Sequence, residues 1–182
     1  MKRNINEDFE PYVDEINDIC RKVLQEVKYN AKLVGLVENQ DWDSFTSPDF
    51  LQRIKNDIPI SPFNYYVDFG GHVANKFQHI LREIYPDYDI ADSGYYYYPP
   101  TGYMSWHTNS NAPGKRVYIT YSNGNSSFRY LDSDSKVQED PDNVDAPTFR
   151  EFDIPEEPSR MWHCVRSENA DRISFGFRLN KK

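Results

Sequence analysis

Apolar positions follow two different periods along this chain, and the change of period divides it into two parts. In roughly the first half they recur with helical spacing, and Pro11 suits a first helical turn. Ser47 before Pro48 predicts an N-cap followed by a proline at the first helical position, and Pro86 predicts a helix end just before it. The expected helices span about residues 9–37, 47–54 and 71–84.

After residue 87, short aromatic and β-branched runs alternate with turn residues, which is typical of strands. These strands are too many for one sheet with a helical cover, and they suit a barrel or sandwich. The sequence therefore predicts a mainly β fold, a double-stranded β-helix of the jelly-roll or cupin type with N-terminal α-helices packed on one sheet. We expect a single domain over residues 1–182, helical over 1–88 and β over 89–182. The expected strands are 94–98, 103–107, 116–122, 127–131, 148–154, 161–167 and 172–179.

The last expected strand has two contrasting faces, because side chains alternate along a strand. An apolar face must pack on other elements, and the N-terminal helices are available for this. In an ordinary sandwich the opposite face would be solvent, but in a barrel it is the cavity, where two guanidinium groups require an anion. The apolar face holds Ile173, Phe175, Phe177 and Leu179, and the other holds Arg172, Ser174, Gly176 and Arg178.

Composition narrows the classes of partner and the compartment. The formal net charge of −8 is opposite in sign to a general phosphate-binding surface, which disfavours nucleic acid as a partner. The two cysteines, Cys20 and Cys164, are far apart, so we expect no disulfide framework and a cytoplasmic location. No apolar run has membrane-spanning length, and the first eight residues do not resemble a signal peptide, so we expect no membrane association.

The stretch 136–146 is acidic and contains proline. We interpret it as a mobile, solvated surface loop that could serve as a lid. It lacks the alternating acidic pattern with a central glycine that a calcium loop requires.

The four histidines fall into two groups. His72 and His79 lie in the third expected helix and are assigned no role. His107 and His163 each follow a tryptophan directly, each on an expected strand, and they are 56 residues apart. Arg172 follows the second of them by nine residues. A lone histidine on a strand is more often a satisfied polar residue than a ligand, but the matching contexts favour a site. The two tryptophans, Trp106 and Trp162, are expected to pack in the wall of the hydrophobic core.

Two imidazoles and one carboxylate on one face form the ligand set of many non-haem Fe(II) sites, with positions left open for other ligands. The order of residues here resembles the 2-oxoglutarate/Fe(II) oxygenase superfamily, whose signature is His-x-Asp/Glu, a second His about fifty residues later, and Arg-x-Ser on the next strand. The resemblance covers about residues 94–179. It implies an Fe(2+) ion bound by His107, Asn109 and His163.

The same resemblance implies residues that bind the co-substrate 2-oxoglutarate. Arg172 and Ser174 correspond to the Arg-x-Ser element, whose arginine pairs with the distal carboxylate of the keto acid through a planar fork. Arg178 resembles the second arginine of the nucleic-acid demethylase branch. Tyr98, nine residues before the first histidine, is a further expected hydrogen-bond partner. The alternative for the arginines is that they form salt bridges outside a binding site. The alternative for the tyrosine is that it takes part only in aromatic packing.

Asn109 stands where the superfamily has a carboxylate, and three explanations are open. Its amide oxygen or a water completes a working metal site, as in the superfamily's halogenases and aspartyl/asparaginyl hydroxylases, which lack this carboxylate and still bind metal. Asp132 or Asp134 supplies the carboxylate instead, although both lie in a loop. Metal binding is lost and the fold survives as a binding module. We favour the first. Deamidation of Asn109 to aspartate is also conceivable.

The expected function is Fe(II)- and 2-oxoglutarate-dependent oxygenation of a small molecule or a protein side chain. Hydroxylation is the default outcome, and halogenation is an alternative if a halide takes the vacant ligand position. Two other classes stay open: a non-catalytic jelly-roll module with a degenerate metal site, and a metal-dependent cupin that works without the keto acid.

Overall fold

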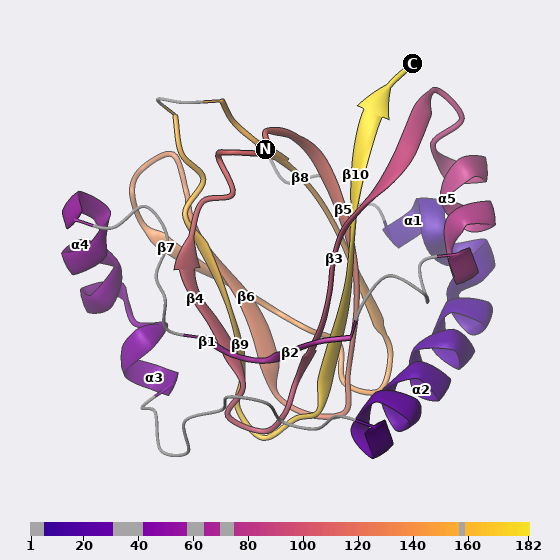
Figure 1. Cartoon of the computed structure of the whole chain (residues 1–182), viewed down its shortest axis with the longest axis horizontal. Coiled ribbons are helices and arrows are strands. Elements are labelled where there is room, and N and C mark those ends of the chain that lie inside the picture. The colour runs from indigo at the N-terminus through magenta and orange to yellow at the C-terminus, as the bar shows by residue number, and fades with distance from the viewer. Residues whose placement is uncertain (1–5, 31–41, 58–63, 70–74, 157–158) are drawn as a thin grey trace.

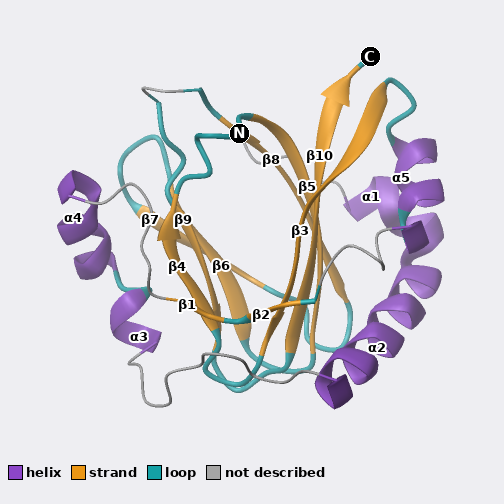
Figure 2. Cartoon of the chain, in the orientation of Figure 1, coloured by secondary structure: helices purple, strands orange, loops and turns teal. Residues whose placement is uncertain are grey.

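Figure 1 shows the computed structural model, which describes residues 6–30, 42–57, 64–69, 75–156 and 159–182. Two β-sheets face each other, and helices lie outside both of them (Figure 2). The expected mainly β, jelly-roll fold is confirmed. His72 and the parts of the expected helices at 31–37 and 71–74 lie outside the described residues.

The helical elements largely follow the predicted positions. The helices are α1 (Asn6–Phe9), the 3-10 turn η1 (Glu10–Tyr12), α2 (Val13–Asn30), α3 (Trp42–Phe45), α4 (Pro48–Asp57) and α5 (Gln78–Ile84). The predicted N-cap of α4 is confirmed, because the Ser47 hydroxyl accepts a hydrogen bond from the backbone N–H of Phe50 at 3.1 Å. None of the described helices is both long enough and apolar enough to cross a membrane.

Every described pairing within the two sheets is antiparallel. One sheet has the order β1-β4-β9-β6-β7 and the other β2-β3-β10-β5-β8. The first comprises β1 (Asn64–Tyr65), β4 (Tyr103–His107), β9 (His163–Ser167), β6 (Ser126–Leu131) and β7 (Val137–Pro141). The second comprises β2 (Val67–Asp68), β3 (Tyr88–Tyr98), β10 (Arg172–Lys181), β5 (Gly114–Ser122) and β8 (Pro147–Ile154).

The helices cover the outer faces of both sheets (Figure 1). Helices α1, α2 and α5 pack on the β10 sheet, as predicted, and the apolar face of β10 lies in their shared core. Helices α3 and α4 cover the other sheet in addition. There, Trp106 and Trp162 form the expected core wall against Phe50 and Leu51 of α4. With both outer faces covered, the inner faces are left to form the site.

The segment 136–146 is not the mobile loop that its composition suggested. Residues Val137–Pro141 form β7, which pairs with β6 at the edge of its sheet. Charged and proline residues are common on edge strands because they discourage pairing with other chains. The acidic composition therefore marks an edge strand here, and the Asp142 side chain that follows it is fully buried.

A bulge in β4 decides which way its histidine points. Met104 pairs with Val165 and His107 pairs with His163, so β4 holds one residue more than β9 between these two pairs. Met104 and His107 both line the space between the sheets, whereas Trp106 packs outward against α4. Strict alternation from Met104 would turn His107 outward, and the bulge reverses this.

Candidate functional site

His107 and His163 meet across the β4–β9 pairing. Their ring centroids are 4.1 Å apart, the ring planes are inclined by 57°, and both residues are buried. Ring nitrogens that bind one ion lie about 2 Å from it, so two imidazoles this close can reach a common ion. The convergence that the sequence predicted for these two residues is therefore present.

Main-chain carbonyls set the orientation of both rings. Nδ1 of His107 lies 2.8 Å from the Ser105 carbonyl oxygen, and Nδ1 of His163 lies 3.0 Å from the Met161 carbonyl oxygen. A carbonyl can only accept, so each Nδ1 carries the hydrogen and each Nε2 presents a lone pair. Histidine ligands of metals are commonly held in this way, with the second nitrogen donating to a carbonyl or carboxylate.

Asn109 lies beside His163. Its Nδ2 is 3.2 Å from His163 Nε2, and because that nitrogen is an acceptor in this tautomer, the amide N–H donates to it. The backbone of Asn109 has φ of 53°, a left-handed conformation that asparagine tolerates better than most residues. An aspartate here would place a carboxylate against a lone pair unless a cation lay between them. The asparagine N–H instead donates to this lone pair, so the contact needs no cation.

The metal ligand set therefore fits in part. Two neutral imidazoles with free Nε2 lone pairs suit Fe(II). Within the described chain, however, no group of three or more His, Cys, Asp or Glu side chains is placed to hold a metal. Asp132 does not supply the missing carboxylate, because its Oδ1 accepts hydrogen bonds from the backbone N–H groups of Asp134 and Lys136 in its own turn, and its Oδ2 accepts one from the Gln138 amide.

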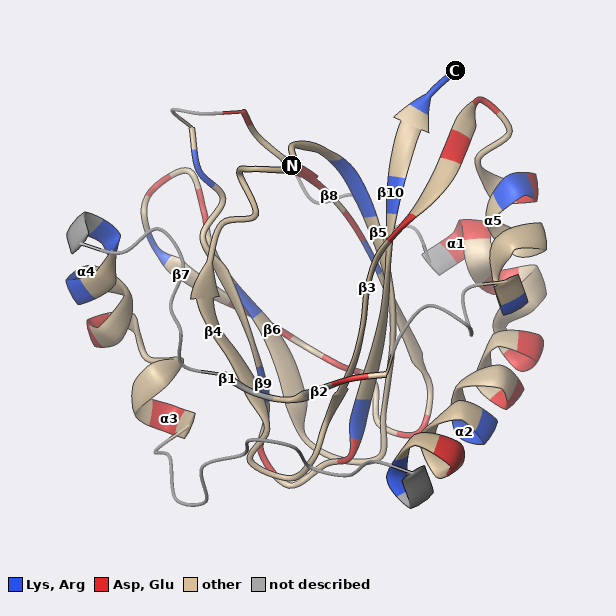
Figure 3. Ribbon diagram, in the orientation of Figure 1, with Lys and Arg blue, Asp and Glu red and all other residues tan. Residues whose placement is uncertain are grey.

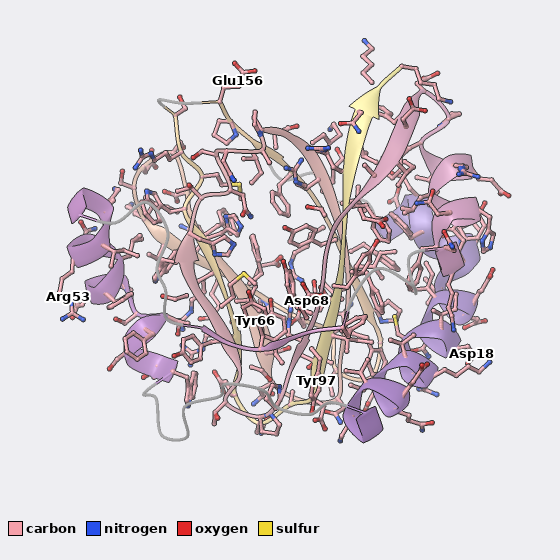
Figure 4. The ribbon with its side chains drawn as sticks, in the orientation of Figure 1. Asp18, Arg53, Tyr66, Asp68, Tyr97 and Glu156 are labelled. Atoms are coloured by element: carbon pink, nitrogen blue, oxygen red, sulfur yellow. The ribbon has the colours of Figure 1, made fainter. Side chains whose placement is uncertain are left out.

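A cavity of about 210 Å³ opens beside the two imidazoles. Tyr66 contacts the tyrosines of its wall and, as Figure 4 shows, lies between the sheets. Two residues of the predicted co-substrate site, Tyr98 and Ser174, line this cavity. The bulge in β3, opposite Gly176 and Phe177, lets the adjacent Ser93 and Gly94 both contribute to the wall.

Arg172 is held by a carboxylate of the chain itself. Its Nε donates to Asp142 at 2.8 Å and its Nη2 to the Thr120 hydroxyl at 3.3 Å, and it is not part of the cavity wall. Its guanidinium lies over the Tyr98 ring, 5.0 Å from the centroid. The expectation that this arginine requires an external anion is therefore corrected: the anion is Asp142, from the segment interpreted as a solvated loop.

Asp142 is the centre of a buried ion cluster. It also accepts a hydrogen bond from Arg150 at 2.6 Å and one from the Ser126 hydroxyl at 2.6 Å. The side chains of Asp142, Arg150 and Arg172 are each at most 1% exposed. Burial alone would raise the pKa of Asp142, but the two guanidinium groups hold it well below its usual range. The cluster links the end of β7 in one sheet to β8 and β10 in the other.

Arg178, the second arginine of the predicted co-substrate site, is half-buried and does not line the cavity. Arg116 of β5, which was not among the predicted site residues, does line it. The signal that could have found it is the cross-strand register of β5 and β10, in which Arg116 is the Cα partner of Arg178.

A second, larger hollow of about 660 Å³ has mainly apolar walls, with Phe128, Phe152 and Met161 among them. The ring centroids of Phe128 and Phe152 lie 5.4 and 6.0 Å from that of His163. Two aromatic rings of this hollow therefore pack against a histidine of the pair.

Comparison with known proteins supports the fold. No protein-family model matches the chain, and no curated protein matches it. Among solved structures, it is similar to a Pseudomonas putida prolyl-4-hydroxylase, with a TM-score of 0.50, 10% identity, and coverage of 90% of this chain and 88% of that one. This likeness shows a shared fold.

Two further solved structures are similar at lower scores. One is a Trichoplax adhaerens prolyl hydroxylase in complex with a hypoxia inducible factor peptide fragment, with a TM-score of 0.46, 14% identity, and coverage of 92% and 91%. The other is a Burkholderia pseudomallei oxidoreductase of the 2OG-Fe(II) oxygenase family, with a TM-score of 0.45, 10% identity, and coverage of 74% and 78%.

We predict that Asp142→Asn lowers the free energy of unfolding by about 3–5 kcal/mol, because it leaves two buried guanidinium groups without a full counter-charge. Urea denaturation measures the change. Glu139→Gln is the matched control, since it breaks an ion pair to Arg129 in which the Glu139 side chain is 42% exposed. Such a pair contributes about 0–1 kcal/mol. Equal effects of the two substitutions would contradict a structural role for the cluster.

We also predict that the metal-free protein loses stability as the pH falls below about 6.5, the ordinary histidine value. Burial lowers the pKa of His107, and burial together with the charges of His107 and Arg116 lowers that of His163 further. Below 6.5 the unfolded chain binds protons that these folded imidazoles do not, so the unfolding free energy decreases with decreasing pH.

Urea denaturation in EDTA at pH 7.5 and 5.5 measures this dependence. It should become weaker in His163→Asn, and His79→Asn, at an exposed histidine on the helical side of the molecule, is the control. A pH dependence that is identical in wild type and His163→Asn would show that His163 does not titrate in this way.

Proposed function

We propose that the chain is an Fe(II)- and 2-oxoglutarate-dependent oxygenase in which His107 and His163 bind the metal. The observation that carries the proposal is the pair of buried imidazoles, with each Nδ1 tied to a carbonyl and each Nε2 free of its own hydrogen. Two Nε2 lone pairs that point into one cavity are the donor set that a divalent metal ion binds. The likeness in fold to a prolyl-4-hydroxylase is consistent with the proposal.

Each of the residues has a separate task. His107 and His163 hold the metal in neutral form, which their lowered pKa values preserve in mild acid. The tyrosines and Met104 of the cavity wall exclude bulk water. Fe(II) with a bound keto acid supplies the chemistry of dioxygen activation, and the protein supplies orientation and a dry pocket. Hydroxylation is the expected outcome.

Asn109 must change its contact for the metal to bind. Turning its side-chain amide would move the N–H away from His163 Nε2 and bring the amide oxygen toward the same place; otherwise water completes the set. In either case the site has one negative charge fewer than a site with a carboxylate, so metal affinity should be weaker. The substrate remains a small molecule or a protein side chain, and the aromatic hollow beside His163 favours an apolar group.

A second candidate function is a non-catalytic binding module, and two observations favour it. Asn109 already satisfies His163 without a metal, and Asp142 already neutralises Arg172 without a keto acid. Both contacts are those expected of a fold that has replaced its ligands with its own side chains. The two candidates differ in whether the imidazole pair takes up Fe(II).

We predict that Fe(II) and 2-oxoglutarate together produce a weak visible charge-transfer band under anaerobic conditions. His163→Ala should abolish the band and His79→Ala should retain it. Asn109→Asp restores the charged ligand and should tighten metal binding at least about tenfold, because a carboxylate adds a charged oxygen ligand beside the imidazoles.

A non-catalytic binding module should give different results in these measurements. If wild type and Asn109→Asp both lack the band, and neither ligand alters the thermal unfolding temperature, the oxygenase proposal is wrong. A band in Asn109→Asp alone would mean that the ligand geometry persists and that the asparagine has disabled the site, which also favours the module for the natural chain.

A further inference from the structure

Arg116 is a buried cation without a counter-charge in the part of the chain that the structure describes. It is 2% exposed, and its guanidinium donates to the main-chain carbonyls of Ala112 and Lys115. Arg150 and Arg172, which are equally buried, both bind Asp142. A buried charge is costly unless an opposite charge accompanies it. Arg116 therefore differs from the other buried arginines in a way that calls for a ligand.

Its neighbour increases the positive charge. Arg178 on β10 is the Cα partner of Arg116 on β5, and like charges directly opposite each other in a sheet are destabilising. The buried Nε of Arg178 has no hydrogen-bond partner among the described residues. Burial and the charge of Arg178 both lower the pKa of Arg116. Figure 3 shows basic stretches on both β5 and β10 toward the end of the sandwich at which the C-terminus lies.

The same guanidinium lies within reach of the histidine pair. Arg116, His107 and His163 line one cavity, and the charge of Arg116 is among the causes that depress the pKa of His163. The other wall residues include Tyr96, Tyr118 and Ser174, whose side chains carry hydroxyl groups. The cavity wall thus combines two potential metal ligands, a cation and several hydroxyl-bearing side chains.

We propose that Arg116 binds the carboxylate of an organic acid in the cavity next to His107 and His163, while Arg178 on the adjacent strand adds positive charge from outside the cavity wall. A planar carboxylate matches the guanidinium fork, supplies the missing counter-charge and relieves the repulsion between the two arginines. The role of that acid in catalysis rests on the proposed function, whereas its binding requires no metal. The carboxylate belongs either to the keto acid or to an acidic substrate. In the first case Arg116 takes the role that the sequence assigned to Arg172, which is bound to Asp142.

The test is a thermal-unfolding titration of the full chain in EDTA with 2-oxoglutarate, acetate and inorganic phosphate. We expect the carboxylates to raise the unfolding temperature of wild type in a saturable way. Arg116→Met should weaken this binding at least tenfold, and Arg116→Lys should weaken it less, because lysine keeps the charge and loses the fork. Arg129→Met is the control, since Arg129 already has a carboxylate partner in Glu139.

The relative affinities identify the source of the carboxylate. Binding of 2-oxoglutarate at least tenfold tighter than acetate assigns the site to the keto acid, and similar affinities assign it to a substrate carboxylate. The proposal is overturned if no carboxylate stabilises wild type, if phosphate alone does so, or if Arg116→Met binds as tightly as wild type. Should Arg116→Met fail to fold, unchanged affinity in Arg116→Lys overturns it equally.

This result is separable from the metal chemistry. Carboxylate binding in EDTA together with no Fe(II) band would leave the Arg116 site standing and remove the oxygenase. If the Fe(II) band appears but Arg116→Met binds carboxylates as tightly as wild type, the oxygenase proposal stands and the Arg116 site is removed.

Discussion

The site depends on a single irregularity of pairing between β4 and β9. One extra residue in β4 turns His107 inward, opposite His163, while Trp106 stays in the outer core. Without that residue the imidazole would face the helices and the tryptophan would fill the cavity. The helices α3 and α4 help to hold the bulge, because Trp106 Nε1 donates to the Ser47 carbonyl and the Ser105 hydroxyl donates to the Phe45 carbonyl. The covering helices therefore contribute to the geometry of the site.

Much of the fold could be predicted because its signals are local. The alternation along β10 identified which face packs on the helices, and the Ser47-Pro48 pair identified where α4 begins. The histidine pair could be predicted from the two matching Trp-His contexts. The first two inferences needed only the residue types within a few positions and the period of a helix or strand. The histidine pair also needed the spacing of 56 residues and the resemblance to a known order of residues, because strand alternation alone does not predict the bulge that turns His107 inward.

What could not be predicted depends on contacts between distant segments. The acidic composition of the 136–146 stretch predicted a solvent-exposed loop. Pairing with β6 instead makes part of it a strand and brings Asp142 to Arg172 and Arg150. No local pattern assigns a carboxylate to one of several arginines, so Arg172 and Arg116 could not be distinguished before the register was known. The direction of the Asn109 amide toward His163 likewise depends on a backbone conformation at a strand end.

The distribution of satisfied and unsatisfied groups is the strongest physical guide to what the cavity does. Arg172 has its counter-charge in Asp142, and His163 accepts a hydrogen bond from the Asn109 amide. Among the described residues, Arg116 makes hydrogen bonds to main-chain carbonyls and forms no ion pair, and a second arginine lies opposite it in the sheet. A buried charge without an opposite charge costs stability, and an apolar residue in its place would avoid that cost. This cost, beside two oriented imidazoles, is the physical basis of the anion site proposed for the cavity.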